Sequence, residues 1–148
     1  MRLRNLTLLS VALVLCVPTL TGCASVHPPP RTGPPPAPFV PTTHAGRQDC
    51  GAVSLGQGDT PPPASLRCFL DAVHDHTPAR LLITAPTVEG DPITTSYLAG
   101  ADGRVEVITD ARADHYGSGR VERQTCTGPT DDQGHWLSFA TCSTPEPL

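Results

Sequence analysis

The sequence predicts an α+β fold in which one helix, at about residues 64–76, packs on an antiparallel meander of about five strands. Three observations carry this prediction. Apolar residues recur with a helical period in one segment, and the segments after it alternate with the period of two that is typical of strands. Four cysteines in the same region can form two disulfides. A helix followed by consecutive strands is the order of an α+β layer.

The helix is predicted by the segment PASLRCFLDAVHDHTP. Its apolar side chains lie three, four and seven residues apart and therefore share one face, namely Leu66, Phe69, Leu70 and Val73. The three prolines before Ala64 suit a first turn, and Thr60 or Ser65 can cap it. Pro78 ends the helix.

Turn signals separate the strands that follow. The sequences Gly90-Asp91-Pro92, Ala101-Asp102-Gly103 and Gly117-Ser118-Gly119 are typical of tight turns. The predicted strands between and after them are Arg80–Ala85, Ile93–Ala99, Arg104–Thr109, Val121–Cys126 and Trp136–Thr141.

The N-terminus has the pattern of an export signal. Arg2 and Arg4 precede the apolar run from Leu6 to Leu20, which is about 15 residues long, whereas a spanning helix needs about 20. The run ends in Leu20-Thr21-Gly22-Cys23, which resembles the lipobox of bacterial lipoprotein precursors. The resemblance implies cleavage before Cys23 and a diacylglyceryl group, hence acyl chains of the palmitate kind, on its thiol. An uncleaved anchor and an ordinary thiol are the alternatives.

These features divide the chain into a lipoprotein signal peptide (1–22), a lipidated cysteine with a proline-rich tether (23–47), a folded domain (48–143) and a tail (144–148). The tether contains eight prolines and few apolar residues, so we expect extended polyproline II that does not fold. Its 24 residues could span roughly 70 Å. A proline-rich ligand for a recognition domain is the alternative to a spacer.

Cysteine usage agrees with export. Cys16 lies in the signal and Cys23 takes the lipid, which leaves four cysteines for two disulfides, namely Cys50, Cys68, Cys126 and Cys142. No C-x-x-C pair supports a zinc site. Cys68 points about 150° from the apolar helix face, so a segment covering the outer helix surface would pair Cys50 with it.

The remaining pair, Cys126–Cys142, conflicts with the predicted strands. In a regular hairpin of the strands Val121–Cys126 and Trp136–Thr141, the two cysteines would be about 17 Å apart. A disulfide requires Cα atoms within about 7 Å. An irregular loop after Cys126, a different partner for the last strand, or a different connectivity would each resolve the conflict.

Charge excludes one class of partner. Without Arg2 and Arg4, eight arginines remain against fourteen acidic residues, so the net charge is about −6. Such a surface repels nucleic acid, because affinity for phosphates comes from Lys and Arg.

The sequence contains no complete catalytic set and indicates no cofactor or metal. His74 and His76 point about 200° apart on a helix and cannot easily share an ion. Glu89 and Asp91 flank a turn glycine, so they are the candidate binding residues for acid–base chemistry or calcium. No glycine-flanked nucleophile elbow is present, and the only tryptophan, Trp136, is expected in the core.

The domain resembles uncharacterised small lipoproteins of actinobacteria in the order Cys50-Gly51, Cys68 on a helix, TVEGDPI, DGRVEV and two late cysteines. This resemblance implies a location and no reaction. The order of one helix and a meander is also similar to the repeat unit of secreted beta-lactamase inhibitor proteins, at the level of the fold alone.

We therefore expect a lipid-anchored binding or envelope-interaction module on the extracytoplasmic face of the cell membrane, with an envelope protein as its partner. An enzyme or calcium-dependent binder that uses Glu89 and Asp91 is the second hypothesis. An accessory subunit or secreted-inhibitor-like protein is the third, and its mark would be a contiguous apolar patch on the exposed sheet face.

Overall fold

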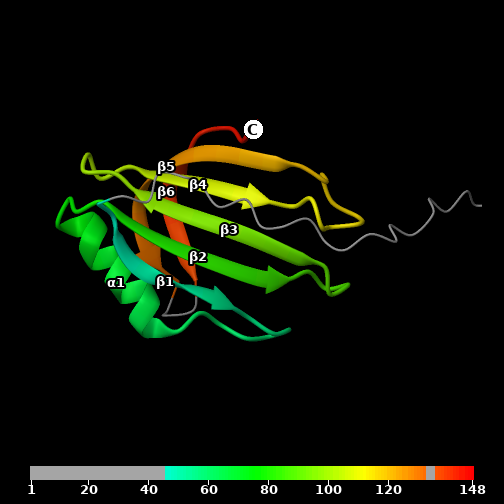
Figure 1. The fold of residues 1–148 in the computed structure, drawn as a ribbon. Coiled ribbons are helices and arrows are strands. Elements are labelled where there is room, and N and C mark those ends of the chain that lie inside the picture. Colours follow the sequence, from blue (N-terminus) through cyan, green and yellow to red (C-terminus); the bar gives the residue numbers. More distant parts are fainter. Residues whose placement is uncertain (1–45, 133–135) are drawn as a thin grey trace, which may run out of the picture. The chain divides into compact units, whose positions relative to one another are not determined.

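The computed structural model describes residues 46–132 and 136–148, which form one helix and a seven-stranded sheet (Figure 1). The predicted signal peptide, Cys23 and nearly all of the tether lie outside the described residues. In chain order the elements are β1 (Gln48–Ser54), α1 (Pro63–His74), β2 (Ala79–Pro86), β3 (Pro92–Ala99), β4 (Val105–Asp110), β5 (Val121–Asp131), β6 (Leu137–Cys142) and β7 (Glu146–Pro147). The α+β class is confirmed, and the sheet has seven strands rather than five.

The sheet is mostly antiparallel and runs in the order β1-β2-β3-β4-β5-β6, with β7 paired to β5. β1 is the exception, because α1 connects it to β2 and the two strands run parallel. A purely antiparallel meander is therefore wrong at this edge. β1 is an irregular strand, because Gly51 has a φ of 113° and the register with β2 shifts between Asp49 and Ala52. Such a strand lacks the regular alternation by which a sequence pattern predicts a strand.

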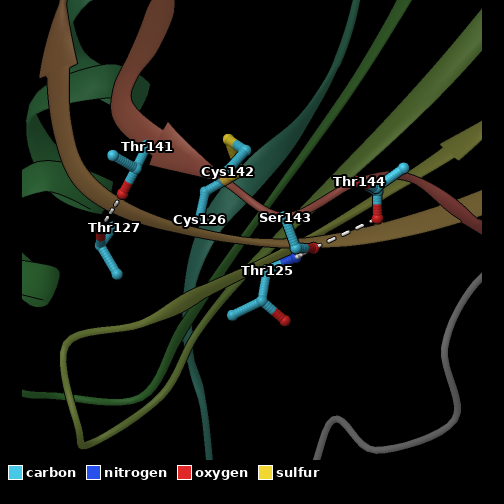
Figure 2. The surroundings of a disulfide bond; sticks show 7 residues. All are labelled: Thr125, Cys126, Thr127, Thr141, Cys142, Ser143 and Thr144. Carbon is cyan, nitrogen blue, oxygen red and sulfur yellow. Dashed lines mark hydrogen bonds between the residues drawn. A yellow bond between two sulfur atoms is a disulfide. The ribbon is translucent and has the colours of Figure 1, made fainter.

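β5 extends five residues beyond the predicted end at Cys126. Its first part pairs with β4 and its second part pairs with β6. Cys126 therefore lies in mid-strand directly opposite Cys142, with Cα atoms 4.1 Å apart, and the two form a disulfide (Figure 2). The expected separation of about 17 Å was wrong because the strand does not turn at Cys126.

Hydroxyl pairs accompany this disulfide along the β5–β6 ribbon. Thr127 and Thr141 lie opposite each other with their Oγ1 atoms 2.8 Å apart (Figure 2), and the hydroxyls of Thr130 and Ser138 are 2.9 Å apart. Beyond Cys142, the backbone N–H of Thr125 donates to the Ser143 hydroxyl at 3.0 Å. Side-chain hydrogen bonds thus join β5 and β6 in addition to the hydrogen bonds of the backbone ladder.

Helix α1 buries Leu66, Phe69, Ala72 and Val73 against the sheet, whereas Leu70 is only half-buried. It begins after Pro62 without a side-chain cap, so the expected capping by Thr60 or Ser65 was wrong. Two adjacent prolines instead fix the first turn. In the described part of the chain, no helix is long and apolar enough to cross a membrane.

The core lies between α1 and one face of the sheet and contains a chain of three aromatic rings. Phe69 on α1 meets Tyr97 on β3 edge to face, with ring centroids 6.1 Å apart. Tyr97 in turn stacks on Phe139 of β6 at 6.2 Å. Phe69 is fully buried and Tyr97 is 8% exposed, so these rings supply much of the apolar area in the centre of the domain.

The Cys50–Cys68 disulfide joins this helix to the edge strand, with Cα atoms 5.6 Å apart. The pairing is the one that the sequence favoured, but the reason differs. Cys50 lies on β1 and is itself part of the buried core, and Cys68 is half-buried against it. The Cys50 segment therefore forms the edge of the sheet and does not cover the outer surface of the helix.

Removal of either disulfide should destabilise the domain by a similar amount. The bonds close sequence separations of 18 and 16 residues, and loops of this length correspond to about 3 kcal/mol each in the chain-entropy model. We expect the double variants Cys50→Ser/Cys68→Ser and Cys126→Ser/Cys142→Ser to lose comparable free energies of unfolding in urea titrations. A loss confined to one pair would contradict this expectation.

Tyr97 should make stability depend on alkaline pH. Burial raises the pKa of its hydroxyl from 10.0 to about 12. The folded pKa is higher than the unfolded one, so this stability is complete below pH 10.0 and is lost as the pH rises toward about 12. In a Tyr116→Phe variant, which leaves one tyrosine, we expect phenolate absorbance to appear only near pH 12. A midpoint near pH 10 in the folded protein would contradict the burial argument.

Candidate functional site

The β2–β3 turn carries both candidate binding residues. Thr87 closes this turn, because its N–H donates to the Asp91 carbonyl at 2.8 Å and its hydroxyl accepts from the Asp91 N–H at 3.2 Å. Gly90 has a φ of 95°, a conformation that favours glycine. Glu89 is exposed and makes no hydrogen bond or ion pair with the described residues. The two acids therefore have different surroundings.

Asp91 binds His115, which lies 24 residues further along the chain in the β4–β5 loop. The backbone N–H of His115 donates to Asp91 Oδ2, and its ring Nδ1 lies next to Asp91 Oδ1, both at 2.9 Å. An ionised carboxylate only accepts hydrogen bonds, so Nδ1 carries the proton. The Asp91 side chain is 18% exposed and that of His115 is 45% exposed.

These contacts lower the pKa of Asp91. The largest cause is the hydrogen bond from the His115 backbone N–H, and the ring hydrogen bond and charge interaction act in the same direction, while burial opposes them. Asp91 is therefore ionised at neutral pH and its two oxygens are engaged. A calcium ion at this carboxylate would compete with the two His115 contacts.

The β4–β5 loop is held by two further carboxylates. Asp110 accepts from the Arg112 guanidinium at 2.7 and 2.9 Å. Asp114 Oδ1 accepts from the backbone N–H groups of Tyr116 and Gly117, both at 2.9 Å. A Cβ on residue 117 would lie 2.1 Å from the Asp114 carboxylate, so a side chain there would displace the carboxylate that holds the loop. The acids at 110 and 114 thus shape the loop.

The β1–α1 loop joins the same cluster through Gln57. Its side-chain amide donates to the carbonyls of Val88 at 3.0 Å and Thr87 at 3.3 Å. The carboxyl ends of strands β1, β2 and β4 lie at the same end of the sheet, and these loops follow them there (Figure 1). We call residues 55–62, 87–91 and 111–120 together the loop surface.

Two large apolar side chains stand out from the loop surface. Val88 is 84% exposed and Tyr116 is 81% exposed, and each sits on a loop that side-chain hydrogen bonds hold in place. Tyrosine offers a large contact area with few rotatable bonds, which suits recognition of another surface. Both side chains are therefore open to solvent on loops whose backbone is held by side-chain hydrogen bonds.

A polar hollow of about 340 Å³ lies elsewhere, lined by Glu106, Arg123, Gln124, Thr125, Ser143 and Glu146. It contains neither Glu89 nor Asp91. Among the described residues, no group of three or more His, Cys, Asp or Glu side chains is arranged to hold a metal ion.

Sequence reasoning missed His115, Tyr116 and Gln57. The Asp91–His115 contact spans two strands, and nothing in the local pattern ADHYGSG distinguishes it from an ordinary loop. Trp136 was expected in the core but is 36% exposed, because it lies in the turn region before β6, where its carbonyl accepts from the Asp132 N–H. The lipidation residue Cys23 lies outside the described residues.

The fold and site define a small disulfide-bonded α+β domain with a fixed, exposed loop surface. Comparisons of the chain with protein-family models, curated proteins and solved structures found no match.

Substitution of Asp91 and of Glu89 should show which of the two acids holds the β4–β5 loop in place. Asp91→Ala removes the acceptor for two His115 groups, so we expect several-fold faster amide hydrogen exchange at His115, while Glu89→Ala leaves that exchange unchanged. The pKa of Asp91 is lowered, so protection should persist at pH 3.8 and disappear as the pH falls through the lowered value. Equal exchange in both variants would show that Asp91 does not hold the loop.

Proposed function

We propose that the chain is a lipid-anchored extracytoplasmic binding module that contacts an envelope protein through the loop surface. The observation that carries the proposal is the exposure of Tyr116 and Val88 on loops that Asp91, Asp114 and Gln57 hold in place. Preorganised loops lose little conformational entropy on binding, so exposed apolar side chains on them contribute efficiently to affinity.

The location in this proposal rests on the N-terminal sequence. The lipobox-like Leu20-Thr21-Gly22-Cys23 supplies the attachment site, and two acyl chains give a stable anchor where a single chain binds only marginally. The proline-rich segment after Cys23 then serves as a spacer between the membrane and the domain. Both disulfides are consistent with an oxidising compartment.

Acid–base catalysis is the second candidate, and the Asp91–His115 pair is the observation that favours it. Asp91 fixes the ring through Nδ1, which directs Nε2 away from the carboxylate, as in sites where a carboxylate orients a general base. Glu89 lies on the same turn. A hydrolysis screen of the wild type against His115→Gln would reveal this activity as turnover that the variant lacks.

Crosslinking in intact cells tests the binding proposal. We expect the native chain to capture one specific envelope protein, and Cys23→Ala to lose it because the chain leaves the membrane. Tyr116→Ala should reduce the yield roughly tenfold or more, as the truncation of an interface tyrosine typically does.

Arg104→Ala is the matched control, because Arg104 is an exposed residue following the β3–β4 turn at the other end of the sheet. It should leave the yield unchanged. Equal capture by Tyr116→Ala and the native chain would reject the loop surface as the binding site. Absence of any specific partner would reject the binding module.

A further inference from the structure

The polar hollow lies on the sheet face opposite α1, where three neighbouring strands contribute its side chains. Its β4 residue, Glu106, alternates along the strand with valines that belong to the core beneath α1, so it points to the other face. Directly paired residues share a face, which places Thr125 of β5 beside Glu106, and Ser143 is hydrogen-bonded to Thr125 from the far side. Arg123 and Glu146 lie opposite each other in the next row.

The ladder between β5 and the C-terminal segment is broken beside this hollow. Ser143 continues the register of β6, whereas β7 is shifted by one residue, so that Glu146 lies opposite Arg123. Thr144 and Pro145 together lie opposite one residue of β5, which is the pattern of a β-bulge. Pro145 has no N–H to give to the ladder, and the Ser143 hydroxyl donates to the Thr144 carbonyl at 3.3 Å (Figure 2). The bulge gives a physical reason for a hollow at this place.

Three charged side chains line the hollow and are only weakly engaged with one another. Arg123 Nη1 lies 3.6 Å from Glu106 Oε1, which is beyond hydrogen-bond distance, and the two side chains are 46% and 38% exposed. Glu146 is exposed and makes no hydrogen bond or ion pair with the described residues. Exposed ion pairs of this kind contribute little to stability, so the fold does not depend on these charges. They are therefore available to a ligand.

The order of the charges across the sheet defines the ligand that they fit. The guanidinium of Arg123 lies on the middle strand, with the carboxylate of Glu106 on one side and that of Glu146 on the other. A guanidinium binds a carboxylate through two parallel hydrogen bonds, and a carboxylate binds an ammonium group. A neutral sugar would leave the excess negative charge unused and would find no aromatic ring to stack on among the lining residues.

We propose that the polar hollow binds a small diamino carboxylic acid, with its carboxylate on Arg123 and its two ammonium groups on Glu106 and Glu146. The volume of about 340 Å³ is at the lower end of the range for small-molecule sites, which suits a single amino acid or a dipeptide. This inference goes beyond the binding module proposed above, because no residue of the loop surface lines the hollow.

An NMR titration of the ¹⁵N-labelled full chain in detergent tests this ligand class, with L-lysine as the probe. L-norleucine lacks the second ammonium group and cadaverine lacks the carboxylate, so both serve as controls at equal ionic strength. We expect the amide signals of Thr125 and Ser143 to shift and saturate at millimolar L-lysine, and either analogue to bind about tenfold more weakly or worse. The absence of a saturable shift with L-lysine, or equal binding of an analogue, would overturn the proposal.

Substitutions at the hollow provide an independent measurement. Glu146→Gln and Arg123→Gln should each weaken L-lysine binding about tenfold, because each removes one charge-assisted contact. Glu122→Gln is the matched control, since this neighbour on β5 pairs with Thr109 and points to the other face of the sheet. Glu146→Gln should leave the Tm unchanged, because the side chain is exposed. Unchanged binding in Glu146→Gln, or an equal loss in Glu122→Gln, would overturn the proposal.

The dipeptide glycyl-L-lysine distinguishes the two sources of this chemistry. It carries the same three charges at a wider spacing. Tighter binding of the dipeptide would support the proposal with a peptide as the ligand, and tighter binding of L-lysine would support it with a free amino acid. None of these titrations involves an envelope protein, so their failure would leave the proposal for the loop surface intact.

Discussion

The chain of rings Phe69, Tyr97 and Phe139 is the contact on which the rest of the domain depends. It joins the helix to β3 and β6, although β4 and β5 separate these two strands in the sheet. Tyr97 and Phe139 can stack only if the sheet curls around α1. Gly128 on β5 allows this curl, because its φ is 62° and a Cβ there would lie 2.8 Å from the Ala140 Cβ. A chain with three phenylalanines and one tryptophan has few other large side chains with which to close its core.

The two disulfides reinforce this curled core from its two sides. Cys50 and Cys126 are both buried in the cluster beneath α1, and each is bonded to a more exposed cysteine, on the helix and on β6 respectively. The bonds thus fix the parallel edge strand and the outer β5–β6 ribbon to the same centre. A domain of about 100 residues buries a limited fraction of its surface, so the two disulfides contribute a large part of its stability.

Sequence patterns predicted the parts of this fold that local rules determine. The helical period located α1 within two residues, and the alternation of β2, β3 and β4 reflects one face buried under α1. β1 and the second half of β5 escaped prediction because glycine, proline and threonine in them are typical of loops, whereas cross-strand pairs hold them extended. Asp91 could be predicted as a candidate from its residue type. Its partner His115 could not, since their contact exists only once β3 and β4 are paired.

Acidic side chains at the loop surface mostly hold the loops in place. In the loop surface, Asp59 accepts from the Gly56 N–H, Asp91 holds His115, and Asp114 holds Tyr116. Each carboxylate satisfies backbone N–H groups that a loop leaves without partners, which is why acidic residues and tight turns occur together here. Because these acids hold the loops in place, Tyr116, Val88 and Glu89 are exposed on fixed loops at one end of the sheet. If the loop surface is the binding site proposed above, this aromatic ring, aliphatic side chain and unengaged carboxylate would suit a partner surface that combines an apolar pocket with a nearby cation.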